Sequence, residues 1–133
     1  MPFRRWIWAT PLTTTLAAVL ASCASSGGFS DLDRDREPKD SVPEVVAFPD
    51  DVEVVPDSSR SVGEYEGAEL WLTRTEDDGV CLLVYPDDVD WVVGCSDIPP
   101  LTVRGPAGGF TVVSDGQDPP ENATTISENV YGP

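Results

Sequence analysis

The arrangement of apolar residues after Arg60 is the feature that most limits the fold of this chain. Runs rich in Val, Leu, Thr and aromatic residues follow one another, and Gly, Pro or Asp interrupts them about every 8 to 12 residues. This pattern is typical of short antiparallel strands joined by turns, and it lacks the period of an amphipathic helix. We therefore predict an all-β fold: a small antiparallel meander, sandwich or rolled barrel. Strands are expected at residues 68–75, 80–85, 91–95, 101–104 and 109–113, with weaker candidates at 61–65 and 124–131.

Two of the three cysteines lie at matching distances from the turn at residues 86–90. Symmetric pairing of the strands across this turn places Leu83 opposite Val93 and Cys81 opposite Cys95. The Cβ atoms of directly opposed residues are about 4.5–5.5 Å apart, which brings the two thiols within reach of a disulfide. The sequence therefore predicts a Cys81–Cys95 bond, worth about 3 kcal/mol for a closed loop of about 15 residues.

The Asp-Gly turn in "TEDDGV" predicts which side chains of the neighbouring strands share a face. With either two or four residues in this turn, Leu70 and Leu72 lie on the same face as Cys81. We expect this face to be the core. The opposite face, which carries Trp71, is expected to be covered by the hairpin of residues 101–113, with an open patch for a partner as the alternative. The predicted core face consists of Leu70, Leu72, Cys81, Leu83, Tyr85, Trp91, Val93 and Cys95.

The N-terminus has the order of a secretory signal peptide. Arg4 and Arg5 precede an uncharged stretch over residues 6–22, which ends in small residues. A charged region, an apolar region and a small-residue cleavage site follow one another in such signals. The stretch is about 17 residues long, whereas a membrane-spanning helix needs about 20 mostly apolar residues. A cleaved signal is therefore favoured over a membrane span.

This signal ends in Leu20-Ala21-Ser22-Cys23, which resembles the lipobox of bacterial lipoproteins. The resemblance implies that residues 1–22 are removed and that the Cys23 thiol carries a diacylglyceryl group. The chain would then be anchored to the extracytoplasmic side of the cell membrane. An ordinary secretory signal that is cleaved near Ala21 and leaves Cys23 free is the alternative. Lipidation of Cys23 would leave Cys81 and Cys95 as a pair, in a compartment where disulfides persist.

Residues 23–59 have the composition of a flexible tether. The segment "ASSGGFS" is small and flexible, and "DLDRDREPKD" has almost no apolar residues. Such segments bury too little apolar surface to offset the entropy of ordering. A tether of about 35 residues has a root-mean-square reach of roughly 30–35 Å. We therefore predict a signal peptide at 1–22, an acidic tether at 23–59 and a β domain at 60–133. Residues 43–58 contain Val45, Val46 and Phe48 between prolines, and packing of this part of the tether along the domain, as extended chain or as an edge strand, is the open alternative.

The charge and the missing histidine exclude several classes of function. The chain has 24 acidic residues, 8 basic residues, no histidine and a net charge of −16. Nucleic acids and anionic lipid surfaces are bound through clustered cations, so both are unfavourable partners. Without histidine the chain lacks the usual general base and the commonest metal ligand. We therefore expect a protein that is not an enzyme and that needs no cofactor.

The loop "PDDVD" offers the one candidate for a metal site. Asp87, Asp88 and Asp90 supply the carboxylate oxygens that Ca²⁺ prefers. Their spacing lacks the frame of an EF-hand loop. A solvated acidic turn is the favoured interpretation, and a calcium-dependent module is the minor alternative.

The stretch "DGVCLLV…WVVGCSDIPPLTVRGPAGGF" resembles small secreted or lipid-anchored domains of unassigned function in high-GC Gram-positive bacteria. The resemblance extends over residues 60–131 and implies no activity. We expect a binding or interaction module displayed at the cell surface, with an unknown envelope protein or ligand as its partner. The alternative is an accessory subunit of an envelope complex, such as a transporter or a wall-processing machine, in which the acidic domain contacts a basic partner.

Overall fold

The structure, a computed structural model, describes residues 28–133. This part of the chain is nearly all β, as predicted. The five strands expected from the sequence are present, and the two weaker candidates correspond to β1 and to the pair β7 and β8. The elements are α1 (Ser30–Asp33), η1 (Pro38–Asp40), β1 (Arg60–Tyr65), β2 (Ala68–Arg74), β3 (Val80–Tyr85), β4 (Val92–Ser96), β5 (Leu101–Gly105), β6 (Gly108–Val112), β7 (Thr124–Thr125) and β8 (Val130–Gly132).

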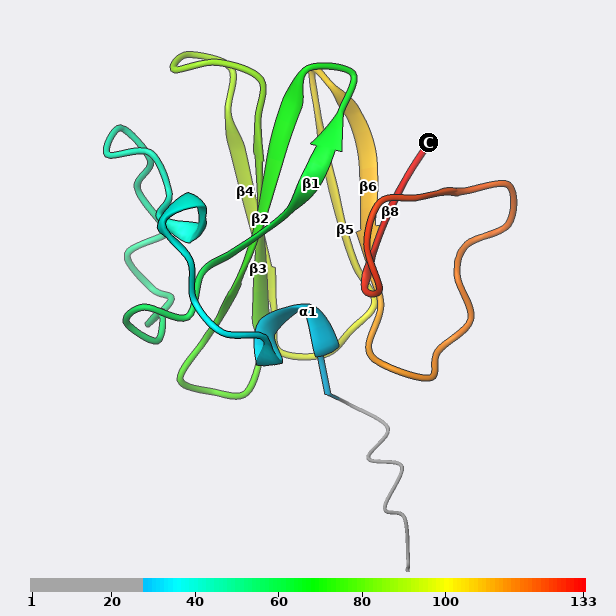
Figure 1. The fold of residues 1–133 in the computed structure, drawn as a ribbon, viewed down its shortest axis with the longest axis horizontal. Helices are drawn as coiled ribbons and strands as arrows, with labels where there is room; N and C mark the ends of the chain where they lie inside the picture. Colours follow the sequence, from blue (N-terminus) through cyan, green and yellow to red (C-terminus); the bar gives the residue numbers. More distant parts are fainter. Residues whose placement is uncertain (1–27) are drawn as a thin grey trace, which may run out of the picture.

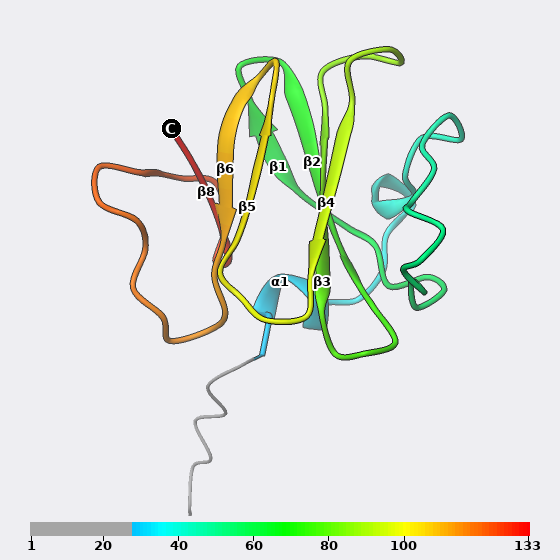
Figure 2. The same cartoon turned by 180° about the vertical axis from the view of Figure 1, so that it is seen from behind.

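The strands form two antiparallel sheets of four strands each. Neighbouring strands follow the order β1-β2-β3-β4 in the first sheet and β5-β6-β8-β7 in the second. The two sheets face each other as separate layers (Figure 1), and Figure 2 shows the same layers from behind. A short connection at residues 97–100 joins β4 to β5. Of the three predicted architectures, the sandwich is therefore the one that the chain adopts.

The core lies between the two sheets. Alternate side chains of β2 and β3 point into it, including Leu72 and Leu82, and they meet Phe110 of β6. At the β4–β5 edge the sheets approach closely, because a Cβ atom on Gly94 would lie 2.6 Å from Cγ2 of Val103. The buried residues of this core are Phe29, Leu32, Ala68, Leu70, Leu72, Val80, Leu82, Val84, Leu101, Val103, Phe110, Val112 and Val130.

The predicted pairing of the cysteines is confirmed, but the predicted core face is wrong. Cys81 lies opposite Cys95 and forms a disulfide with an S–S distance of 2.04 Å. However, the register places Leu72 opposite Leu82 and Thr73 opposite Cys81. The β2–β3 connection therefore spans residues 75–79, an odd number, whereas the prediction assumed two or four residues. Because side chains alternate along a strand, this difference moves the disulfide from the core to the outer face of the first sheet.

The N-terminal segment also differs from the prediction, because residues 28–59 do not form a free tether. Phe29 and Leu32 are only 3% and 4% exposed and belong to the core. Residues 34–58 lie along the outer face of the first sheet as a third layer (Figures 1 and 2). On this face the Trp71 indole Nε1 donates a hydrogen bond of 3.2 Å to the backbone oxygen of Lys39. The folded domain thus begins at least 30 residues before the predicted boundary at Arg60; residues 23–27 of the predicted tether lie outside the described residues.

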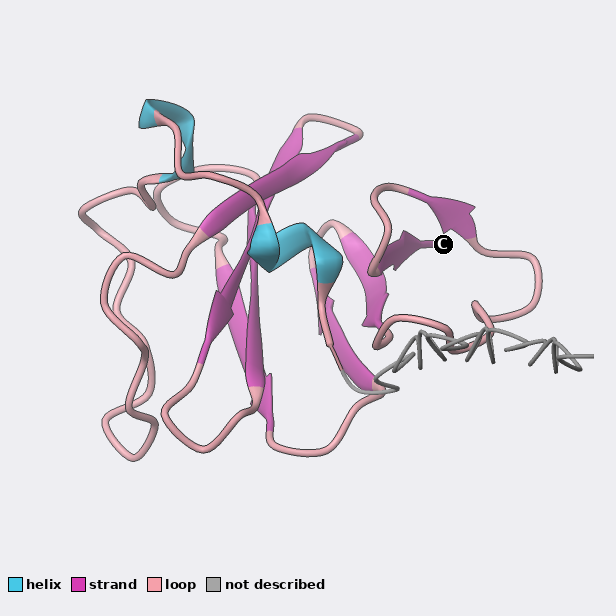
Figure 3. Cartoon of the chain, turned by 60° about the horizontal axis from the view of Figure 1, so that its bottom comes forward, coloured by secondary structure: helices cyan, strands magenta, loops and turns pink. Residues whose placement is uncertain are grey.

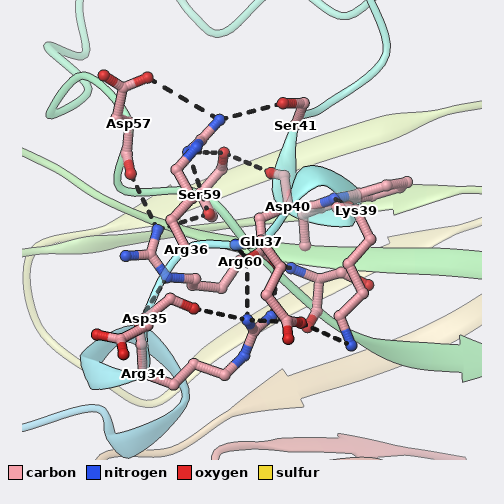
Figure 4. Close-up of polar contacts among 12 residues, drawn as sticks. Arg34, Asp35, Arg36, Glu37, Lys39, Asp40, Ser41, Asp57, Ser59 and Arg60 are labelled. Atoms are coloured by element: carbon pink, nitrogen blue, oxygen red, sulfur yellow. Dashed lines mark hydrogen bonds and ion pairs between the residues drawn. The ribbon is translucent and has the colours of Figure 1, made fainter.

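An ion pair between Arg34 and the buried carboxylate of Asp40 attaches this segment to the edge of the first sheet (Figure 4). The carboxylate of Asp40 is fully buried; it accepts hydrogen bonds from Arg34, from the backbone N–H of Glu37 at 2.7 Å and from that of Ser61 at 2.8 Å. Arg34 also donates to the backbone oxygen of Ser61 at 2.7 Å. Burial alone would raise the pKa of Asp40, but these hydrogen bonds outweigh it and hold the pKa well below its usual range. Charged side chains, rather than apolar burial, therefore order much of this segment.

The short helix α1 closes one end of the sandwich, between the two sheets (Figure 3). Its N-terminal residues are bonded to loops of the second sheet. The backbone N–H of Asp31 donates to Oδ1 of Asn129 at 3.0 Å, and the side chain of Asp31 accepts from Ser127 at 2.6 Å. The N-terminal segment therefore contacts both sheets.

Candidate ligand-binding groove

The outer face of the second sheet carries a row of hydroxyl side chains. The register aligns Thr102 of β5 with Thr111 of β6, Thr111 with Tyr131 of β8, and Tyr131 with Thr125 of β7. The alternate residues of these strands, such as Phe110, point into the core. Thr102 and Thr125 are exposed, so this face has no cover comparable to the layer on the first sheet.

A groove of about 500 Å³ opens at one end of this face. It lies between the β4–β5 connection and the loop that follows β6, which is the orange loop in Figure 1. Thr111 belongs both to this groove and to the row of hydroxyl side chains. The residues that line the groove are Pro99, Pro100, Thr111, Val113, Ser114, Gln117, Asp118 and Pro120.

The loop that forms one wall of the groove is held by Asp115. Its carboxylate accepts hydrogen bonds from the backbone N–H and the hydroxyl of Ser30, at 3.0 and 2.8 Å, and from the side-chain amide of Asn129 at 2.9 Å. Burial opposes the ionisation of Asp115, but the bonds from Asn129 and Ser30 outweigh it and lower the pKa of this carboxyl. Asn129 is fully buried and also donates to the backbone oxygen of Val113 at 2.9 Å. These bonds therefore hold the loop after β6, which is one wall of the groove, against α1 and the core.

The lining offers apolar contact together with a few hydrogen-bonding groups. Three prolines and Val113 supply the apolar surface, and Ser114, Gln117 and Asp118 supply donors and acceptors. A concave, mainly apolar site with a few polar groups is the usual form of a ligand-binding pocket, and its volume lies within the typical range of about 300–1,000 Å³. The arrangement is suited to binding.

The three aspartates of the predicted calcium loop are Asp87, Asp88 and Asp90. They lie at the exposed tip of the β3–β4 hairpin, where Oδ1 of Asp87 accepts the backbone N–H groups of Asp90 at 2.6 Å and Val89 at 2.8 Å. These bonds, chiefly the one from Asp90, lower the pKa of Asp87 and serve the turn itself. Within residues 28–133, no group of three or more His, Cys, Asp or Glu side chains is placed to hold a metal ion. Asp87, Asp88 and Asp90 therefore lie in an exposed turn that hydrogen bonds from its own backbone stabilise.

Of the other predicted site residues, Cys81 and Cys95 are joined as expected, whereas Cys23 lies outside the described residues. The groove was not predicted from the sequence. Its two walls come from "DIPP" and "SDGQDPP", which are typical of simple connections between strands. The sequence carries one signal of it: each segment contains a Pro-Pro pair, and the segments precede β5 and follow β6, which pair with each other.

Comparison with protein-family models, with curated proteins and with solved structures finds no match to this chain. Among the helices of residues 28–133, none is long and apolar enough to cross a membrane.

Proposed function

We propose that this chain is a lipid-anchored protein of the cell surface whose β domain binds a ligand in the groove. The observation that carries the proposal is the contrast between the two outer faces. The outer face of the first sheet is covered by residues of the same chain, whereas that of the second sheet is open and bordered by a preformed groove. A domain of this size gains stability from covering apolar surface, so an open concave face with a fixed wall favours a binding role.

The anchoring part of the proposal rests on the signal sequence and Cys23. Phe29 is buried in the core and follows Cys23 by six residues. Six residues span at most about 20 Å when fully extended. If Cys23 carries the lipid, the domain is thus held close to the membrane, nearer than the roughly 30–35 Å expected of a long flexible tether.

Three carboxyl groups of the domain have structural roles. The carboxyl groups of Asp40, Asp87 and Asp115 all have lowered pKa values, which keeps them ionised. Each accepts hydrogen bonds that stabilise a turn, a strand edge or a loop. These three groups therefore have structural roles.

Anchoring and binding are tested separately. Full-length wild type is expected to partition into the detergent phase, and Cys23→Ala is expected to remain in the aqueous phase; equal partitioning would refute the anchor. For binding, a photoreactive amino acid is placed at Gln117 in the groove or at Glu64 on β1, both of which are exposed. Cross-linking in intact cells is expected from position 117 and not from position 64. Equal cross-linking from the two positions, or none from position 117, would refute the groove as the binding site.

A further inference from the structure

We propose that the ligand of the groove is a basic segment of another polypeptide that inserts an apolar side chain. This inference rests on the proposed function, because it names the class of ligand for the same groove. The first observation is the charge of the domain. Residues 28–133 contain 24 acidic and 6 basic side chains (the 8 of the whole chain less Arg4 and Arg5), so their net charge is −18.

Most of the basic side chains are already engaged within the domain. Arg34, Arg36, Lys39 and Arg74 form ion pairs with carboxylates, and Arg60 donates to backbone oxygens. These pairs neutralise charge on the first sheet and its cover. The sixth basic side chain, Arg104, is exposed on β5, and the remaining carboxylates far outnumber it. Charges of one sign on a protein surface steer partners of the opposite sign toward it. A basic partner is therefore attracted and an acidic one is repelled.

The groove itself adds an apolar element to this acidic surface. Asp118 lines it, Asp97 lies just before it in the chain, and no basic side chain is among its lining residues. Ile98, which directly precedes the groove residue Pro99, is 81% exposed. An exposed aliphatic side chain beside walls of proline and valine favours burial of an apolar group from a partner. The lining contains no aromatic ring on which a sugar could stack, so a polypeptide fits this surface better than a saccharide.

The tip of the β3–β4 hairpin also combines an exposed apolar side chain with carboxylates, but it is not part of the groove. At the tip of the β3–β4 hairpin, Val89 is 84% exposed and is flanked by Asp88 and Asp90. This tip projects from the end of the sandwich opposite to the β4–β5 connection that carries Ile98 (Figures 1 and 2). If charge and exposed apolar surface were enough, the tip would bind as well as the groove. The tip therefore supplies a matched control for the effect of concave shape.

The experiment measures fluorescence anisotropy of labelled peptides on the full-length protein in a neutral detergent. The probe is the peptide KKGLGKK, and the comparison peptides are EEGLGEE, which reverses the charge, and KKGSGKK, which removes the apolar side chain. KKGLGKK is expected to bind more tightly than both, and its affinity is expected to fall as NaCl is raised from about 50 to about 500 mM. Tighter binding of EEGLGEE, or equal binding of KKGSGKK, would overturn the inference.

Four single variants then locate the site. D118N is expected to weaken KKGLGKK binding by about 5-fold and I98S by on the order of 10-fold. The matched variants D88N and V89S at the hairpin tip are expected to leave it within about 2-fold. Equal losses at the two places would mean that the peptide is held by general charge attraction, which overturns the inference. Far-ultraviolet circular dichroism of each variant verifies that the fold is retained.

The outcome also separates this inference from the proposed function. If KKGLGKK does not bind while position 117 still cross-links to a partner in cells, the class of ligand is wrong and the binding function stands. If chitotetraose, a neutral oligosaccharide, binds and loses affinity in Thr111→Arg but not in V89S, the groove recognises saccharides and the inference is overturned. If the peptide fails and no cross-link forms from position 117, both proposals are wrong.

Discussion

The outer faces of the two sheets differ in how far the rest of the chain covers them. On the first, Trp71 and Leu83 are 5% and 1% exposed, and the irregular segment of residues 34–58 lies along it. On the second, Thr102 and Thr125 remain exposed beside the groove. The domain thus uses its N-terminal segment to complete its packing on one side and leaves the other side accessible.

The sequences of two strands reflect this difference. In β3, "VCLLVY", every residue except the last is buried, because one face meets the core and the other meets the N-terminal segment. In β5, "LTVRG", buried and exposed residues alternate, because one face meets the core and the other meets solvent. A continuous apolar run indicates a strand that is covered on both sides, whereas alternation indicates one exposed face. The alternating sequence of β5 therefore encodes a sheet with one solvent-exposed face.

The largest effect is expected from deleting the N-terminal segment. A chain that begins at Arg60 lacks Phe29 and Leu32 from the core and Asp40 from the edge of β1. It also uncovers Trp71. We expect residues 60–133 to fail to fold, as judged by the loss of amide dispersion in a nitrogen–proton NMR spectrum, whereas residues 28–133 give a dispersed spectrum. A dispersed spectrum from the shorter chain would show that the first sheet is stable without its cover.

The next largest effect is expected from Asp40→Ala. The substitution removes the shorter of the two ion pairs of Arg34, which keeps Glu37 at 3.6 Å, and it removes the acceptor of the backbone N–H groups of Glu37 and Ser61. Each buried backbone donor that is left without an acceptor costs about 1–3 kcal/mol, and the loss of the charge-assisted bonds from Arg34 adds to this. Urea unfolding at neutral pH measures this loss. Asp118→Asn, at an exposed carboxylate in the groove, serves as the control and should change the free energy of unfolding by less than about 0.5 kcal/mol.

The contribution of Asp40 should also depend on pH. Its pKa is lower in the folded protein than in the unfolded chain, where it is about 3.9. The unfolded chain therefore takes up the proton first as the pH falls, so the stabilisation is complete above about pH 5 and is lost progressively below about pH 4. The difference in unfolding free energy between wild type and Asp40→Asn should shrink from pH 7 to pH 3. A constant difference over this range would contradict the assigned role of the ionised carboxylate.

A somewhat smaller effect is expected from removing the disulfide. The Cys81–Cys95 bond links β3 to β4 on the covered side of the first sheet. Loss of a closed loop of about 15 residues costs about 3 kcal/mol on the chain-entropy model. The variant Cys81→Ala/Cys95→Ala should unfold at a correspondingly lower urea concentration with an unchanged groove, as shown by unchanged KKGLGKK binding. A loss of peptide binding in the folded variant would show that the two sheets are coupled.

Much of the β fold could be predicted because strands and turns are local properties. The Cys81–Cys95 pairing followed from symmetry across a single hairpin, and it was correct. The facing of β2 and β3 could not be determined, because an apolar run that is buried on both sides fits either register equally well. The actual connection has five residues, in which Thr75 accepts the N–H of Gly79 through its side chain and that of Asp78 through its backbone. The number of residues in this turn depends on that bonding and not on the Asp-Gly pair alone.

The N-terminal segment and the groove could not be predicted for a different reason. Composition treats the charges of "DLDRDREPKD" as solvated, whereas Arg34 and Asp40 pair with each other and with Ser61, about 20 residues or more further along the chain. Such long-range pairing leaves no local pattern. The groove likewise joins residues around Pro99 to residues around Gln117, which are brought together only by the fold. Local propensity therefore predicted the strands, while long-range contacts determined the cover and the site.

The smallest effect is expected at the open face, and two threonines provide a matched test of the comparison. Thr102 is exposed on the second sheet, and Thr73 is 3% exposed beneath the cover of the first sheet, near Ser58. Thr102→Lys places its charge in water and should change the free energy of unfolding by less than about 0.5 kcal/mol. Thr73→Lys would bury an unpaired charge or displace the cover, and it should be several-fold more destabilising in the same urea titration.

A loss of more than about 1.5 kcal/mol in Thr102→Lys would contradict the assignment of an open face, because surface substitutions rarely cost so much. Sedimentation velocity of the wild type would then identify the reason. A dimer that dissociates in Thr102→Lys would mean that a second copy covers the hydroxyl row, so that both outer faces would be closed and the groove would be reached only from its rim. If instead Thr102→Lys shows only the small change expected and both proteins are monomers, the outer face of the second sheet is free for a partner.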